Sequence, residues 1–135
     1  MNILMDASAI ITMIIDEPEK DLIINLTKDV ELLSPKMVPF EIGNALTRLK
    51  RRHILNEEKI IEAYNVYRKI PLRLVEVNIE NALNIACKYN IYAYDAYYLE
   101  AAFRLKLPLL TLDKPMKNIA KKMNLDILGE NDENI

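Results

Sequence analysis

Residues 2–6 read NILMD, a short apolar run that ends in an aspartate, and this run indicates how the chain folds. Such a run is typical of a buried strand, which Asp6 ends. A helical pattern follows at once, over about 7–15. Strands that alternate with helices are joined by crossovers, which place the strands parallel in one sheet with helices on both faces.

The alternation continues along the chain. Further strands are predicted at 31–34, 72–77, 109–112 and, weakly, 125–128, and further helices at about 18–28, 38–52, 57–69, 79–89, 94–106 and 114–123. In the helix over 38–52, the apolar residues Ile42, Ala45, Leu46 and Leu49 have the spacing of one buried face. The sequence therefore predicts an α/β protein with a mostly parallel sheet.

The length of 135 residues suits one domain, predicted over 1–128, followed by an acidic and flexible tail over 129–135. A net charge of −2 argues against a general nucleic-acid coat protein. Cys87 is the single cysteine, so an internal disulfide is excluded and a reducing compartment is expected. Because Cys87 lies in an apolar helical pattern, it is predicted to be a small core residue.

The N-terminal apolar run lacks a basic region and is interrupted by Asp6, which predicts neither a signal peptide nor a membrane span. We expect a cytoplasmic protein without a membrane partner. The two glycines, Gly43 and Gly129, cannot build a GxGxxG or Walker phosphate loop.

Four acids stand where helices begin, namely Asp6, Glu41, Asp95 and Asp113. Each has an ordinary explanation. Asp6 and Asp113 can cap the helices that follow them, Glu41 suits the positive end of its helix, and Asp95 can be a cap or a first-turn acid. Asp6 and Asp113 also follow strands, so both are expected at the carboxyl edge of the sheet, where sites form in open α/β proteins.

Together the four acids predict a metal site, because clustered carboxylates repel one another unless a cation lies among them. Carboxylate oxygens suit Mg²⁺ or Mn²⁺, and with His53 as the single histidine a His-rich zinc site is excluded. We rank Asp6, Glu41 and Asp95 as the ligand core, with Asp113 acting through water or partly as a cap. Ser8 and Thr111 can bond the carboxylates, or be an ordinary helix hydroxyl and an ordinary strand residue.

A basic run, RLKRRH, covers residues 48–53. Cations at the C-terminal end of a helix complement its dipole, and this is the simpler explanation. The alternative is that Arg48, Lys50, Arg51 and Arg52 bind the phosphates of a nucleic acid substrate.

Four segments in order resemble the PIN-domain family of metal-dependent nucleases, most of all the VapC toxins of VapBC toxin–antitoxin systems. They are LMDAS (4–8), VPFEIGNA (38–45), YDAYYLEAA (94–102) and LTLD (110–113). The resemblance implies a three-layer α/β/α fold with a five-stranded parallel sheet, in which Asp6, Glu41 and Asp95 match the most regular acids and Asp113 a less strict one. It also implies Mg²⁺ or Mn²⁺, cleavage of single-stranded RNA, a homodimer and a small antitoxin partner.

Other interpretations remain open. The chain could be a housekeeping RNA-processing nuclease of the PIN type, or a PIN-like binding module without activity. Phosphoryl transfer through an aspartyl-phosphate is disfavoured, because Ser8 stands where a dehalogenase-type phosphatase has a second aspartate and because 72–77 ends at Asn78 rather than at a phosphoacceptor. Tyr92, Tyr94, Tyr97 and Tyr98 either pack against a neighbouring helix or form a surface for the antitoxin.

Overall fold

Parallel strands form the centre of the protein, whose computed structural model describes residues 1–129. Within these residues four strands are ordered β3-β2-β1-β4. They are β1 (Asn2–Met5), β2 (Glu31–Pro35), β3 (Leu72–Val75) and β4 (Leu109–Leu110). Ile3 pairs with Leu32 on one side of β1, and Met5 pairs with Leu110 on the other. The ends of β1 and β4 are therefore adjacent.

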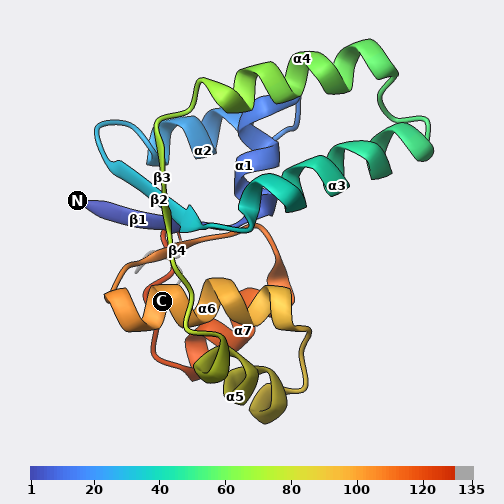
Figure 1. Ribbon diagram of the computed structural model, residues 1–135. Coiled ribbons are helices and arrows are strands. Elements are labelled where there is room, and N and C mark those ends of the chain that lie inside the picture. Colours follow the sequence, from blue (N-terminus) through green and yellow to red (C-terminus); the bar gives the residue numbers. More distant parts are fainter. Residues whose placement is uncertain (130–135) are drawn as a thin grey trace.

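Helices cover both faces of this sheet, which confirms the three-layer α/β/α prediction (Figure 1). One layer holds α1 (Ala7–Ile14), α2 (Lys20–Leu26), α3 (Val38–Arg51) and α4 (Glu57–Arg68), and the other holds α5 (Ile79–Tyr89), α6 (Ala93–Leu105) and α7 (Lys114–Lys122). Across residues 1–129, these helices are all too short or too polar to cross a membrane.

The core is built on β1 and α6. Ile3, Leu4 and Met5 are fully buried one after another, as expected for a parallel strand covered on both faces. Ser34 Oγ donates to the Met5 carbonyl over 2.8 Å and so ties β2 to the end of β1. Leu99 of α6 is also fully buried in this core. The tight packing fixes the strand end that carries Asp6.

The predicted strand count of five is wrong for the described residues. The segment over 125–128 contributes one isolated parallel bridge, between Leu109 and Ile127. Strand β4 is also shorter than predicted, because two backbone N–H groups beyond it bond to side chains. Leu112 N–H donates to Ser8 Oγ over 2.9 Å, and Asp113 N–H donates to Thr111 Oγ1 over 3.0 Å. The predicted tail over 129–135 lies outside the described residues except for Gly129.

The core position predicted for Cys87 is also wrong, because the side chain is exposed. Helix α5 packs through Ala82, which is fully buried, while Ile79 and Leu83 are 58% and 47% exposed. Ile79, Leu83 and Cys87 follow one another at four-residue spacing, so they share one face of the helix. The apolar residues of α5 thus lie on two sides of the helix. The side with Ala82 faces the core, and the side with Cys87 faces away from it.

Candidate active site

Asp6 lies at the carboxyl edge of the sheet and is 3% exposed. Its backbone N–H donates to the Leu110 carbonyl over 3.2 Å, which holds the ends of β1 and β4 together. Its carboxylate caps α1 by accepting the Ala9 N–H over 3.0 Å. The cap predicted from the sequence is therefore present, and it holds the carboxylate in place.

Two hydroxyl groups complete the surroundings of this carboxylate. Ser8 Oγ donates to one Asp6 oxygen over 2.7 Å, and the Thr111 hydroxyl donates to the other. Each hydroxyl also accepts a backbone N–H from the segment that follows β4. Both hydroxyls thus make the hydrogen bonds predicted for them, and they fix the orientation of Asp6.

The buried surroundings of Asp6 disfavour the ionised form of its carboxyl group. Burial raises the pKa of its carboxyl group from 3.8 to about 6, although the bonds from Thr111, Ala9 and Ser8 lower it. The nearby charge of Asp113 raises the pKa further. A buried anion beside another anion is the environment that a bound cation relieves.

Glu41 and Asp95 lie in the first turns of α3 and α6, respectively. The N-cap of α6 is Tyr92, so Asp95 is a first-turn acid rather than a cap. Burial raises the pKa of Asp95, and the charges of Asp113 and Glu41 raise it further. Asp113 caps α7 by accepting the Met116 N–H over 3.0 Å. The four acids are thus linked by electrostatic repulsion. The charge of Asp113 acts on both Asp6 and Asp95, and the charge of Glu41 acts on Asp95.

Sequence reasoning missed how Tyr98 takes part in this site. Its side chain is 2% exposed, and its hydroxyl donates to Glu41 Oε1. Burial raises the pKa of Tyr98, and the hydrogen bond and charge of Glu41 add to the effect, so the phenol stays protonated as a donor. Tyr98 lies one turn after Asp95 on α6, and this spacing was the signal available in the sequence.

The donor set fits Mg²⁺ or Mn²⁺ by its chemistry, since it consists of carboxylates that repel one another. In the described part of the chain, three or more His, Cys, Asp or Glu side chains do not gather closely enough to hold one ion by themselves. Mg²⁺ in proteins keeps several waters and takes only one or two carboxylates directly, with substrate phosphate completing the shell. An arrangement of spaced carboxylates suits that mode of binding.

A cavity of about 420 Å³ opens beside Glu41 and Ser8, between α1 and α3. Asn44, Arg48 and Arg52 line it as well. These three residues follow one another at four-residue spacing, so they form one stripe that leads away from Glu41. Lys50 and Arg51 fall on other sides of the helix. The structure thus separates two of the four predicted basic residues from the other two.

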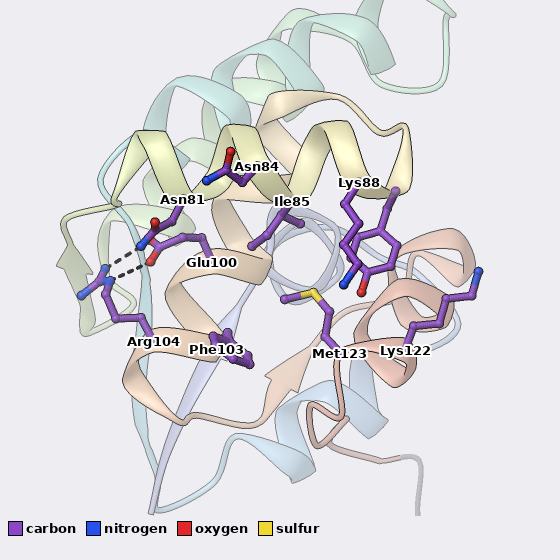
Figure 2. A pocket seen from close by; sticks show the side chains of 10 residues that line it. Asn81, Asn84, Ile85, Lys88, Glu100, Phe103, Arg104, Lys122 and Met123 are labelled. Carbon is purple, nitrogen blue, oxygen red and sulfur yellow. Dashed lines mark hydrogen bonds and ion pairs between the residues drawn. The ribbon is translucent and has the colours of Figure 1, made fainter.

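A larger cavity, of about 610 Å³, lies away from these acids, between α5, α6 and the end of α7 (Figure 2). Its wall contains an ion pair that the sequence analysis missed, between the buried Glu100 and the 38% exposed side chain of Arg104. Glu100, 2% exposed, accepts from Arg104 Nε over 2.7 Å and from the Asn78 N–H over 2.8 Å. Arg104 also donates to the Glu76 carbonyl over 2.7 Å. These bonds anchor the start of α5 to α6, and the four-residue spacing of the pair was its sequence signal.

Known proteins resemble the chain over most of its length. Ribonuclease VapC3 of Pyrobaculum aerophilum is 25% identical over 121 residues, which are 86% of this chain and 92% of that protein. The sarcin-ricin loop cleaving toxin VapC20 of Mycobacterium tuberculosis has the same fold, with a TM-score of 0.61 at 13% identity over 86% of this chain and 93% of that one. VapBC2 of Rickettsia felis, solved with a promoter DNA fragment, gives a TM-score of 0.64 at 14% identity over 94% and 97%.

The decisive match is to the family model of the PIN domain, which covers residues 3–122. That range includes the buried β1 strand, all four acids and the helices that position them. Since both the sequence and the arrangement of layers agree, the chain belongs to the PIN domain family.

Proposed function

We propose that this protein is a metal-dependent endoribonuclease and the toxin of a toxin–antitoxin pair. The observation that carries the proposal is the buried Asp6 carboxylate, which three donors hold near the charge of Asp113. The charges of Asp113 and Glu41 in turn act on Asp95. Likeness to Ribonuclease VapC3 supports the choice of RNA as substrate.

One or two of the carboxylates of Asp6, Glu41 and Asp95 would bind Mg²⁺ or Mn²⁺ directly and the rest through water, and Asp113, which caps α7, would also act through water. A divalent ion bound there polarises a phosphate oxygen and makes a bound water more acidic. Ser8, Thr111 and Tyr98 keep the carboxylates oriented, so the site needs little rearrangement on binding. Water attacks phosphorus and gives up a proton while the bond to the 3′ oxygen breaks, and that oxygen takes up a proton, which leaves a 5′-phosphate and a 3′-hydroxyl.

The stripe of Asn44, Arg48 and Arg52 would bind the RNA backbone next to the cleaved bond. We expect Arg48→Gln with Arg52→Gln to raise KM for RNA severalfold and to lower the salt dependence of binding by about two phosphate contacts. The matched control is Lys50→Gln with Arg51→Gln, which removes the same charge from the same helix outside the cavity. Cleavage kinetics at several salt concentrations measure both double variants. Equal effects of the two would contradict RNA binding by the stripe of Asn44, Arg48 and Arg52.

The direct test of the proposed activity is cleavage of single-stranded RNA by the purified protein. We expect cleavage with Mg²⁺ or Mn²⁺, loss of cleavage in EDTA, and recovery when the metal is restored. Mapping of the ends should give 5′-phosphates and 3′-hydroxyls. Cleavage that is unchanged in EDTA, or products with cyclic phosphates, would refute the mechanism.

The proposal extends to a cytoplasmic homodimer that a small antitoxin inhibits. Solved relatives include toxin–antitoxin complexes, such as the one from Klebsiella pneumoniae. Expression of the chain alone should stop growth, and co-expression of the small protein encoded beside it should restore growth. A housekeeping nuclease would not need such a neighbour.

A further inference from the structure

A separate small cavity lies where α3, α5 and α6 begin. Its volume is about 230 Å³, and its walls include Met37, Ile79, Tyr94 and Tyr97, with Lys36 and Glu76 also in the lining. This volume is below the roughly 300–1,000 Å³ typical of pockets for drug-sized ligands. It suits a flat group of the size of one ring system.

Two of the helices that line this cavity, α3 and α6, also carry proposed metal ligands in their first turns. Tyr94 immediately precedes Asp95 on α6, and Met37 lies one turn before Glu41 at the start of α3. The Glu41 N–H donates to the Met37 carbonyl over 3.3 Å, so the two positions are held together by backbone. The cavity and these two acids therefore belong to the same first turns of α3 and α6.

The two tyrosine rings in the wall of this cavity contact each other without a ligand. The rings of Tyr94 and Tyr97 meet edge to face, with centroids 5.6 Å apart at 83°. Tyr94 nevertheless remains 51% exposed. Tyr97 thus braces a ring that is still open to a ligand, and aromatic rings in this situation stack nucleobases of single-stranded RNA.

The polar groups of the lining favour an uncharged ligand. Lys36 Nζ lies 2.5 Å from Glu76 Oε1, so the two charges compensate each other. The pair carries no net charge, so it offers no net attraction to a phosphate or to a basic side chain. A nucleobase carries donors and acceptors without net charge, and it can bond to both groups at its edge.

We propose that this cavity binds one base of the RNA substrate, that of a nucleotide next to the cleaved phosphate, by stacking on Tyr94. The inference rests on the proposed function, since it names how that site holds its substrate. The arginine stripe would then bind the RNA backbone, and the tyrosine pair would bind a base.

The test measures binding of a fluorescein-labelled single-stranded RNA by anisotropy, with Ca²⁺ in place of Mg²⁺ and with a gel to verify that the RNA stays intact. Tyr94→Leu should weaken binding about tenfold or more, and Tyr94→Phe, which keeps the ring, should restore it. Tyr64→Leu is the matched control, because Tyr64 is 40% exposed and pairs with Tyr67 on α4, away from the site.

A second measurement shows whether the ring and a base meet. RNAs with one abasic nucleotide, placed at each position in turn, should include one that binds the wild type about tenfold more weakly but costs Tyr94→Leu nothing further. The inference would be overturned if the losses of affinity from the abasic nucleotide and from Tyr94→Leu were additive at every position. It would also be overturned if Tyr94→Leu left RNA binding unaffected, which is the result expected if a protein side chain fills the cavity. Because binding is read apart from cleavage, intact cleavage without stacking would refute only this inference. Stacking without cleavage would refute only the proposed function.

Discussion

Replacement of Asp6 with asparagine is expected to reduce RNA cleavage at least about a hundredfold while stabilising the metal-free protein at neutral pH. Loss of a residue that merely orients a metal ligand costs about 10–100-fold, so loss of a ligand itself should cost more. Asparagine keeps the shape of the side chain and an oxygen for the Ala9 N–H, so α1 keeps its cap. Cleavage is measured with Mg²⁺ present.

The stability gain follows from the raised pKa of Asp6. Folding shifts this pKa from 3.8 to about 6, so between these values the folded state binds more protons than the unfolded state. Stability of the metal-free protein therefore falls as pH rises through that range. A shift of about two pKa units corresponds to about 3 kcal/mol, an upper limit for the gain from Asp6→Asn above pH 6. Urea unfolding in EDTA at several pH values measures it.

The matched control is Asp126→Asn, which removes the same charge from an exposed position beyond α7. It should leave cleavage unchanged and should not stabilise the protein as Asp6→Asn does. The joint result is diagnostic, because an ordinary folding defect lowers activity and stability together. Full cleavage by Asp6→Asn, or a variant less stable than the wild type at about pH 8, would contradict the role given to Asp6.

The second large effect concerns the ion pair of buried Glu100 with the partly exposed Arg104 in Figure 2. Arg104→Met should destabilise the protein by about 2–4 kcal/mol, because it leaves the Glu100 carboxylate, 2% exposed, with the Asn78 N–H as its remaining hydrogen-bond donor. Methionine retains most of the apolar stem of arginine, so the loss reports the charge and its hydrogen bonds rather than a cavity. The midpoint of urea unfolding measures the change.

Arg73→Met is the matched control for this prediction. Arg73 pairs with Glu31 over 3.3 Å on the edge strand, where both side chains are largely exposed, and such pairs contribute less than about 1 kcal/mol. Adding Glu100→Gln to Arg104→Met should recover part of the lost stability, because the buried charge is then gone. If the two arginine variants cost the same, the Glu100–Arg104 pair does not anchor α5 to α6.

The layers of the fold could be predicted because each element has a local pattern. Buried strand β1 and the helix that follows it are visible in residues 2–14, and alternation along the chain determined the parallel sheet. What failed depends on tertiary contacts. β4 ends early because Ser8 and Thr111, from two segments, accept backbone N–H groups there, and Cys87 is exposed because α5 packs through Ala82 instead.

The candidate site shows the same division. The acids were found because each stands at the start of a helix, and for Asp6 and Asp113 the cap and the proposed ligand are one side chain. A helix cap and a metal ligand, which were alternative explanations of these acids in the sequence, are therefore compatible roles for one side chain in the structure. The Tyr98–Glu41 bond could not be predicted, because it requires α6 to approach α3 across the sheet edge.

The most direct test of the metal site is a crystal soaked in Mn²⁺ and measured at a wavelength where manganese scatters anomalously. We predict an anomalous peak bound by carboxylates of Asp6, Glu41 or Asp95, with Asp113 near it. The peak should be lost in crystals of Asp6→Asn that keep the same fold. Manganese bound elsewhere, with no peak among these carboxylates, would contradict the central claim that the four acids form a metal site.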